Sequence, residues 1–210
     1  MRKRGSARIS ARSRRAPRPK STSARSSSSR DAEHAKVAKH AKVAKHPEKG
    51  SAASAVSALS ALLANALGWH DAHVDFERAV DAVPADMRGR KPQGLPYSLW
   101  QLLEHLRISQ RDVLEFCRNP NYVEAKWPDD YWPQTDAPPD AAAWDKSITA
   151  FRRDRDALKA LASDPRLDLF ATIPHGSGQT YLRELVLMID HNAYHIGELV
   201  AARRVLGLWR

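Results

Sequence analysis

The sequence predicts an all-α protein, a four-helix bundle preceded by a long basic tail. Three observations carry this prediction. From Ser51 onward, four stretches place apolar residues at helical spacing. Irregular connectors that contain proline and glycine separate these stretches. Residues 1–50 differ in composition, because they hold 16 Lys and Arg but only 3 Asp and Glu. Four long helices with non-repetitive connectors most simply pack as a bundle.

The tail is expected to be disordered over residues 1–50, and the folded domain to span residues 51–210. The tail has a net charge of +13, whereas residues 51–210 have a net charge of −3. Residues 1–30 contain no acidic or aromatic residue, so little apolar surface is available to offset the entropy of folding. The hexapeptide HAKVAK then occurs twice, with a period that matches neither a helix nor a strand.

Several roles remain open for the tail. No apolar stretch follows its basic start, which argues against a secretory signal, but Arg- and Ser-rich composition is also typical of organellar transit peptides. An over-extended start is another alternative. The tail would attract nucleic acid weakly and without sequence preference. Since it lacks interleaved aromatic residues, nucleic acid ranks last among the partners.

Composition also restricts the folded domain. Cys117 is the only cysteine, so neither an intramolecular disulfide nor a thiolate metal cage can form. No run of about 18 apolar residues is present, so we expect no membrane-spanning helix and no membrane partner. A reducing compartment fits the single cysteine, and we expect a cytoplasmic protein.

The first two helices are expected on either side of a polar loop. The first runs from Ala55 to Val83, with a bend or break at Gly68 and an end before Pro84. The second begins after Ser98, because Ser98 and Gln101 have the spacing of a capping box. Tyr97 and Leu102 can form the accompanying hydrophobic staple, and Asn119 with Pro120 ends the helix.

The last two helices follow a long connector with the sequence NPNYVEAKWPDDYWPQTDAPPD. Such a loop often covers a site, and its aromatic residues Trp127, Tyr131 and Trp132 are candidates for a lid. Asp140 can cap the third helix. Thr180 can cap the fourth, which is expected from Tyr181 to about Leu206, with Gly207 at its end.

The stretch DHNAYHIGEL carries the chemistry. Residues four apart lie on one helical face, so His191 and His195 can bind one metal ion, and Glu198 lies close to the same face. His105 on the second helix would add a third nitrogen if the bundle core brings the helices together. Three nitrogen ligands leave positions open for water or substrate, as in catalytic sites. The alternative is that all three are core histidines with satisfied hydrogen bonds.

Other residues are weaker candidates. Glu198 can orient a ligand or act in catalysis, and a solvated glutamate is an equal alternative. Cys117 lies 12 residues beyond His105, about 18 Å along a helix, which is too far to bind the same ion. The remaining candidates could line a pocket, or could be core or exposed residues: His73, Trp100, Trp132, His175 and Tyr194.

Two of these stretches resemble the DinB-like family. LPYSLWQLLEHLRISQRDVLEF is similar to its second helix, and LRELVLMIDHNAYHIGELVAARRVLGLW to its last. The likeness extends over roughly residues 58–210 and leaves the tail outside. The family fold is a four-helix bundle with one metal-binding histidine on the second helix and two on the last. The resemblance therefore implies a DinB-type bundle in which His105, His191 and His195 bind a divalent metal.

The resemblance also implies a class of function. Relatives in the broader superfamily use such an ion to activate low-molecular-weight thiols, which suggests a metal-dependent transferase or hydrolase acting on a small molecule. The alternative is a non-catalytic metal-binding bundle in a stress response. Imidazole binds Zn, Ni, Fe and Cu alike, so the metal is left open among Zn, Ni and Fe. Bundles of this kind often pair, which makes a homodimer one option, and the sequence leaves the oligomeric state open.

Overall fold

The computed structural model describes residues 52–209. Within this range the regular structure is helical, and the one β-type pairing is an isolated bridge between Thr172 and Thr180. No helix in the described range is long and apolar enough to span a membrane. The predicted disordered tail and its boundary at residue 50 lie outside the described residues and remain predictions.

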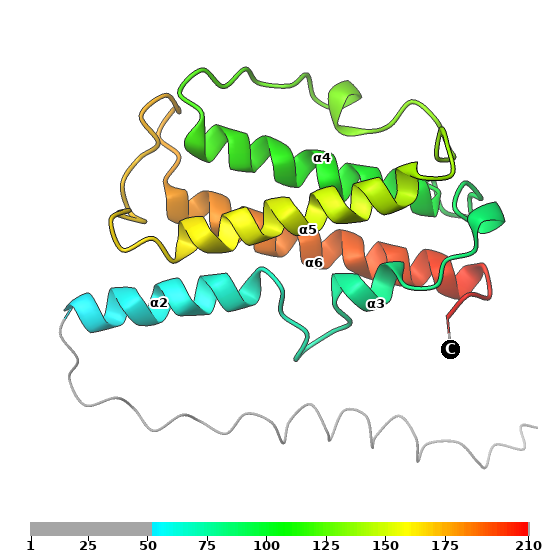
Figure 1. Ribbon diagram of the computed structural model, residues 1–210, viewed down its shortest axis with the longest axis horizontal. Helices are drawn as coiled ribbons and strands as arrows, with labels where there is room; N and C mark the ends of the chain where they lie inside the picture. The colour runs from blue at the N-terminus through cyan, green and yellow to red at the C-terminus, as the bar shows by residue number, and fades with distance from the viewer. Residues whose placement is uncertain (1–51, 210) are drawn as a thin grey trace, which may run out of the picture. The chain divides into compact units, whose positions relative to one another are not determined.

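Four long helices pack lengthwise against one another, which confirms the predicted all-α bundle (Figure 1). They are α2 (Ala52–Ala66), α4 (Leu99–Arg118), α5 (Ala143–Ala162) and α6 (Tyr181–Val205). Helix α4 contacts both α5 and α6, and α2 also contacts both α5 and α6. A short helix, α3 (Phe76–Val80), contacts α6 farther along the bundle. Two single-turn helices, η1 (Ala85–Met87) and η2 (Asp129–Tyr131), lie in the connectors.

The predicted break at Gly68 in the first helix is confirmed, but the interruption is longer than a bend, and the helical segments do not have the predicted bounds of Ala55 and Val83. Helix α2 begins three residues earlier and ends at Ala66, and helical structure resumes only at Phe76. The Asp75 carboxylate accepts a hydrogen bond from the backbone N–H of Arg78, so it starts α3 as a new helix. Helix α3 then ends at Val80, since Ala82 adopts the left-handed conformation with φ of 50°.

The predicted ends of α4 and α6 are confirmed. Ser98 and Gln101 form both hydrogen bonds of the capping box, and Asn119 follows the last turn of α4. Thr180 caps α6, and Gly207 adopts φ of 73° after its end. Asp140 does not cap α5, which begins at Ala143. The Asp140 side chain accepts from the N–H of Ala142 in a turn one step earlier.

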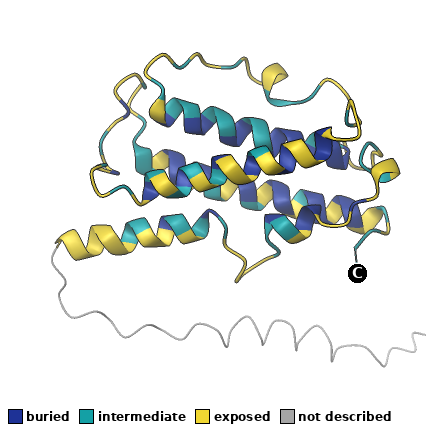
Figure 2. Ribbon diagram, in the orientation of Figure 1, coloured by how far each residue is buried: buried dark blue, intermediate teal, exposed yellow. Residues whose placement is uncertain are grey.

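The core consists of two apolar clusters along the bundle, on the inward sides of the helices (Figure 2). One cluster contains Leu102, Leu103 and Leu106 of α4, and the other contains Met188 of α6. Burial of each such side chain contributes about 2 kcal/mol to stability. His105 therefore lies on the same stretch of α4 as these buried leucines and is itself buried.

Candidate metal centre

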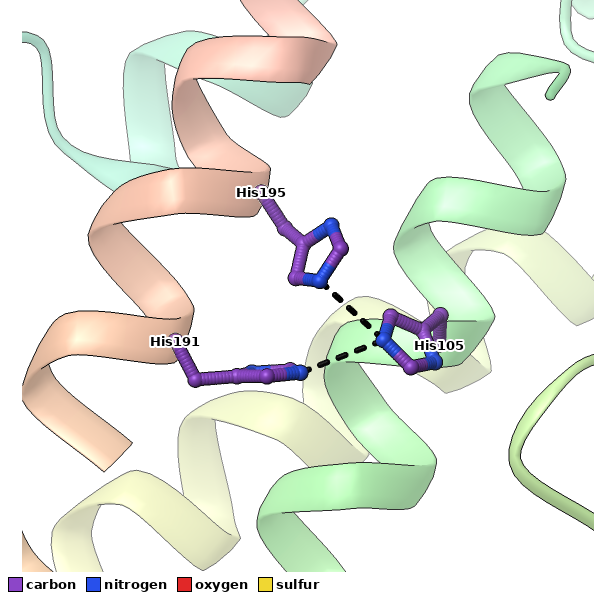
Figure 3. A group of neighbouring side chains, drawn as sticks. All are labelled: His105, His191 and His195. Carbon is purple, nitrogen blue, oxygen red and sulfur yellow. Dashed lines mark hydrogen bonds between the residues drawn. The ribbon is translucent and has the colours of Figure 1, made fainter. Parts of the chain in front are cut away.

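Three histidine side chains meet between α4 and α6. His105 projects from α4, while His191 and His195 project from successive turns of α6 toward it (Figure 3). The Nε2 atom of His105 lies 3.1 Å from Nε2 of His191 and 3.1 Å from Nε2 of His195. His105 and His195 are buried, and His191 is half-buried. The structure thus brings together the three residues that the sequence predicts as metal ligands, in an arrangement that can hold an ion.

The hydrogen bonds of the two Nδ1 atoms indicate the tautomers of His105 and His195. Nδ1 of His105 is 2.9 Å from the carbonyl oxygen of Tyr131, and Nδ1 of His195 is 2.7 Å from Oε2 of Glu198. Both oxygens are acceptors, so each Nδ1 carries the hydrogen and donates it. A neutral imidazole has only one N–H group. The Nε2 atoms of His105 and His195 therefore present lone pairs to each other.

Two lone pairs 3.1 Å apart repel, so the contact between these two Nε2 atoms is not a hydrogen bond. A cation between them removes the repulsion. Two nitrogens on one tetrahedral zinc, each at about 2.0–2.1 Å, lie about 3.3 Å apart, close to the observed spacing. Nε2 of His191 also lies 3.1 Å from Nε2 of His105, and its buried Nδ1 has no hydrogen-bond partner, so Nε2 of His191 faces the same point as the other two. The residues present therefore fit a divalent metal ion.

Burial keeps these rings neutral. Burial, together with the neighbouring histidines, lowers the pKa of His191 to about 4 and that of His195 to about 4. Burial also lowers the pKa of His105. Since metals bind the neutral imidazole, protons do not compete with a metal for these nitrogens near neutral pH.

Glu198 and Tyr194 form the rim of the centre on α6. Burial raises the pKa of Glu198, and the charge of Glu198 raises the pKa of Tyr194. The Tyr194 ring is 63% exposed and meets the His195 ring edge-on at 4.8 Å. An exposed aromatic side chain therefore lies directly beside the buried His195.

The loop between α4 and α5 covers the other side. Trp132 stacks on His105 with ring centroids 3.8 Å apart and planes 2° from parallel, and it also stacks on Tyr97. Trp127 is 71% exposed, and its ring lies 6.5 Å from that of His105. The loop thus lies against the centre, and its opening as a lid remains a prediction.

Three predicted pocket residues lie apart from the histidines. Trp100 is buried in the core. His73 is exposed in the loop before α3, where its Nδ1 contacts the carbonyl of Val74. His175 contacts the carbonyl of Phe116 near the end of α4, 11 residues and about 16 Å beyond His105. Within residues 52–209 no hydrogen bond or ring contact joins these three to the centre, and a pocket role for them remains untested.

Two groups, the Tyr131 carbonyl and the Asp112 carboxylate, were not predicted from the sequence. The carbonyl of Tyr131 orients His105 although 26 residues separate them, and Asp112 accepts hydrogen bonds from the phenol groups of Tyr122 and Tyr131. Asp112 lies seven residues after His105 and so on the same helical face, which is the one available signal. No sequence signal marks a backbone carbonyl.

Comparison with known proteins identifies a family. The family model of the DinB superfamily matches residues 68–199, a range that contains all three histidines and the covering loop. No curated protein and no solved structure matches the chain.

Proposed function

The chain belongs to the DinB superfamily, and on that premise we propose that it is a metal-dependent enzyme acting on a small molecule. His105, His191 and His195 would hold one Zn²⁺, Ni²⁺ or Fe²⁺ ion. The observation that supports this most directly is the pair of Nε2 lone pairs 3.1 Å apart, with both Nδ1 protons directed outward. With both Nδ1 protons directed outward, His105 and His195 cannot satisfy each other's Nε2 by a hydrogen bond.

The bound ion would lower the pKa of a thiol or water and would polarise a substrate carbonyl. The chain contributes the remaining features. Glu198 accepts the Nδ1 proton of His195, which fixes the tautomer and raises the basicity of Nε2. Burial brings the pKa of Glu198 closer to neutral, so this carboxylate is our candidate for accepting a proton from the substrate.

Access to the centre favours catalysis over a closed structural site. Three protein ligands leave coordination positions open. Tyr194 and Trp127 at the rim are largely exposed, while Trp132 excludes water from the face of His105. We propose that a small substrate approaches from the Tyr194 side. We propose transfer to a low-molecular-weight thiol as the co-substrate, with hydrolysis by water as the other candidate reaction.

Elemental analysis tests metal binding. The full chain would be purified without added metal and without a polyhistidine tag, and we expect about one equivalent of a transition metal. His105→Ala and His195→Ala should each lose the metal. The matched control replaces the tail histidines His34, His40 and His46 by alanine and should keep it. Wild-type protein that is metal-free and gains no stability from added ions would refute the proposal.

A second experiment separates an enzyme from a non-catalytic metal protein. The loaded protein would be incubated with low-molecular-weight thiols and electrophiles, with consumption of the thiol measured. We expect turnover that Glu198→Gln reduces. Metal binding at full stoichiometry without turnover of any thiol would instead support the non-catalytic alternative.

A further inference from the structure

One carboxylate of α4 holds two tyrosines of the loop that covers His105. The Tyr131 hydroxyl donates to Oδ2 of Asp112 over 2.7 Å, and the Tyr122 hydroxyl donates to Oδ1 over 2.9 Å. Asp112 is half-buried on α4, two helical turns beyond His105. Burial and these hydrogen bonds raise the pKa of both phenols, so the two donors keep their protons.

Tyr131 has a second contact that Tyr122 lacks. Its backbone carbonyl accepts the Nδ1 proton of His105 over 2.9 Å, while its side chain holds Asp112. One residue thus connects the carboxylate to a predicted metal ligand. The next residue, Trp132, stacks on the face of the same imidazole. The hydroxyl of Tyr122 holds only the start of the loop.

We propose that Asp112 is a positioning residue for the metal centre, acting through Tyr131 to fix the tautomer and orientation of His105. The inference rests on the proposed metal-binding function. Asp112 does not touch the centre. It sets the position of the Tyr131 carbonyl, and that carbonyl keeps the proton of His105 on Nδ1 so that Nε2 stays a ligand.

Tyr131→Phe and Tyr122→Phe form a matched pair. Each removes one hydroxyl that donates to Asp112, and each keeps its aromatic ring contact, with Trp127 for Tyr131 and with Phe116 for Tyr122. The dissociation constant for Zn²⁺ would be measured on the full chain by competition with a chromophoric chelator. We expect Tyr131→Phe to raise this constant about 10-fold and Tyr122→Phe to change it less than about 3-fold.

A double-variant cycle tests the path through Tyr131. If Asp112 acts through Tyr131, Asp112→Ala and the double variant Asp112→Ala/Tyr131→Phe should each weaken Zn²⁺ binding about as much as Tyr131→Phe alone. Independent effects would multiply to about 100-fold. The unfolding temperature of each metal-free variant would be recorded, and Asp112→Asn would replace Asp112→Ala if the latter does not fold.

A spectroscopic readout separates positioning from general loss of stability. The visible absorption of bound Co²⁺ reports ligand arrangement, and it should differ from wild type in Tyr131→Phe but not in Tyr122→Phe. Equal Zn²⁺ constants in the two phenylalanine variants would overturn this inference alone. Wild-type protein that binds no Zn²⁺ would overturn the proposed function and this inference with it.

Discussion

The buried hydroxyl group of Ser98 makes two hydrogen bonds. Replacement of Ser98 by alanine should show how much these two bonds contribute to the free energy of unfolding. The hydroxyl oxygen accepts from the backbone N–H of Gln101 over 3.1 Å, which caps α4. The same hydroxyl donates to the carbonyl of Asp136 over 2.6 Å, which holds the far end of the covering loop. Ser98 has no exposed surface.

The expected loss can be built from these two contacts. Removing a helix cap costs about 1 kcal/mol. Losing a hydrogen bond inside the protein costs about 1 kcal/mol more, since the carbonyl of Asp136 lies in an exposed residue and water can replace the donor. Ser98→Ala should therefore lower the free energy of unfolding by about 2 kcal/mol, which corresponds to a drop of about 4–8 °C in melting temperature.

Thr180→Ala is the matched control. Thr180 caps α6 by accepting from the N–H of Arg183, and its hydroxyl has no counterpart to the bond with Asp136. Thr180→Ala should lower the free energy of unfolding by about 1 kcal/mol, half the loss expected for Ser98→Ala. Urea unfolding would be followed by circular dichroism with a chelator present, so that bound metal adds no stability. Equal losses in the two variants would refute the contribution of the loop contact.

Three further predictions follow from the burial of titratable groups. Glu198→Gln replaces the charged acceptor of the His195 Nδ1 proton. The Zn²⁺ dissociation constant, measured by chelator competition, should therefore rise about 10-fold. An unchanged constant would contradict the role assigned to Glu198. Burial raises the pKa of Cys117 to about 12, so iodoacetamide at pH 8 should leave the folded protein unmodified and react in urea. Rapid labelling of the folded protein would count against this burial. The pKa values of His191 and His195 are about 4, against an ordinary value near 6.5, so the unfolded chain binds more protons between these limits. The metal-free protein should therefore lose stability as the pH falls from about 6.5 to 4, and a urea midpoint that stays constant over this range would refute the shift.

Sequence reasoning succeeded where the signals are local. The capping box at Ser98 and the threonine at position 180 act within one helical turn, so they place the starts of α4 and α6 without knowledge of the fold. The first helix was predicted only in part, because its one marked breaker, Gly68, indicates the break but not the start of α3 at Phe76. Asp75 caps a new helix there, but an aspartate inside a helix-like run does not distinguish a cap from an exposed side chain.

In the candidate site, too, local features were predicted and those that depend on tertiary packing were harder to predict. The pair His191 and His195 follows from helical spacing alone, and Glu198 lies three residues beyond His195, within reach of its ring. The meeting with His105 depends on how α4 packs against α6, which the sequence indicated through the expected bundle core and through the family resemblance. The carbonyl of Tyr131 could not be predicted, since every residue of the loop carries an equivalent group.

The candidate metal centre depends on two hydrogen bonds from Nδ1 atoms, one to a residue of a helix and one to a loop. Glu198 orients His195 from the same helix, so that contact persists as long as α6 is folded. His105 is oriented by a loop carbonyl, which exists in place only while the loop lies against α4. If a metal binds more tightly when His105 is oriented, the bound metal must stabilise the loop by the same free energy. The free energy that couples loop order to metal binding can therefore be measured from either side. Substitution of Asp112, which holds the loop, should change this coupling without removing a proposed metal ligand.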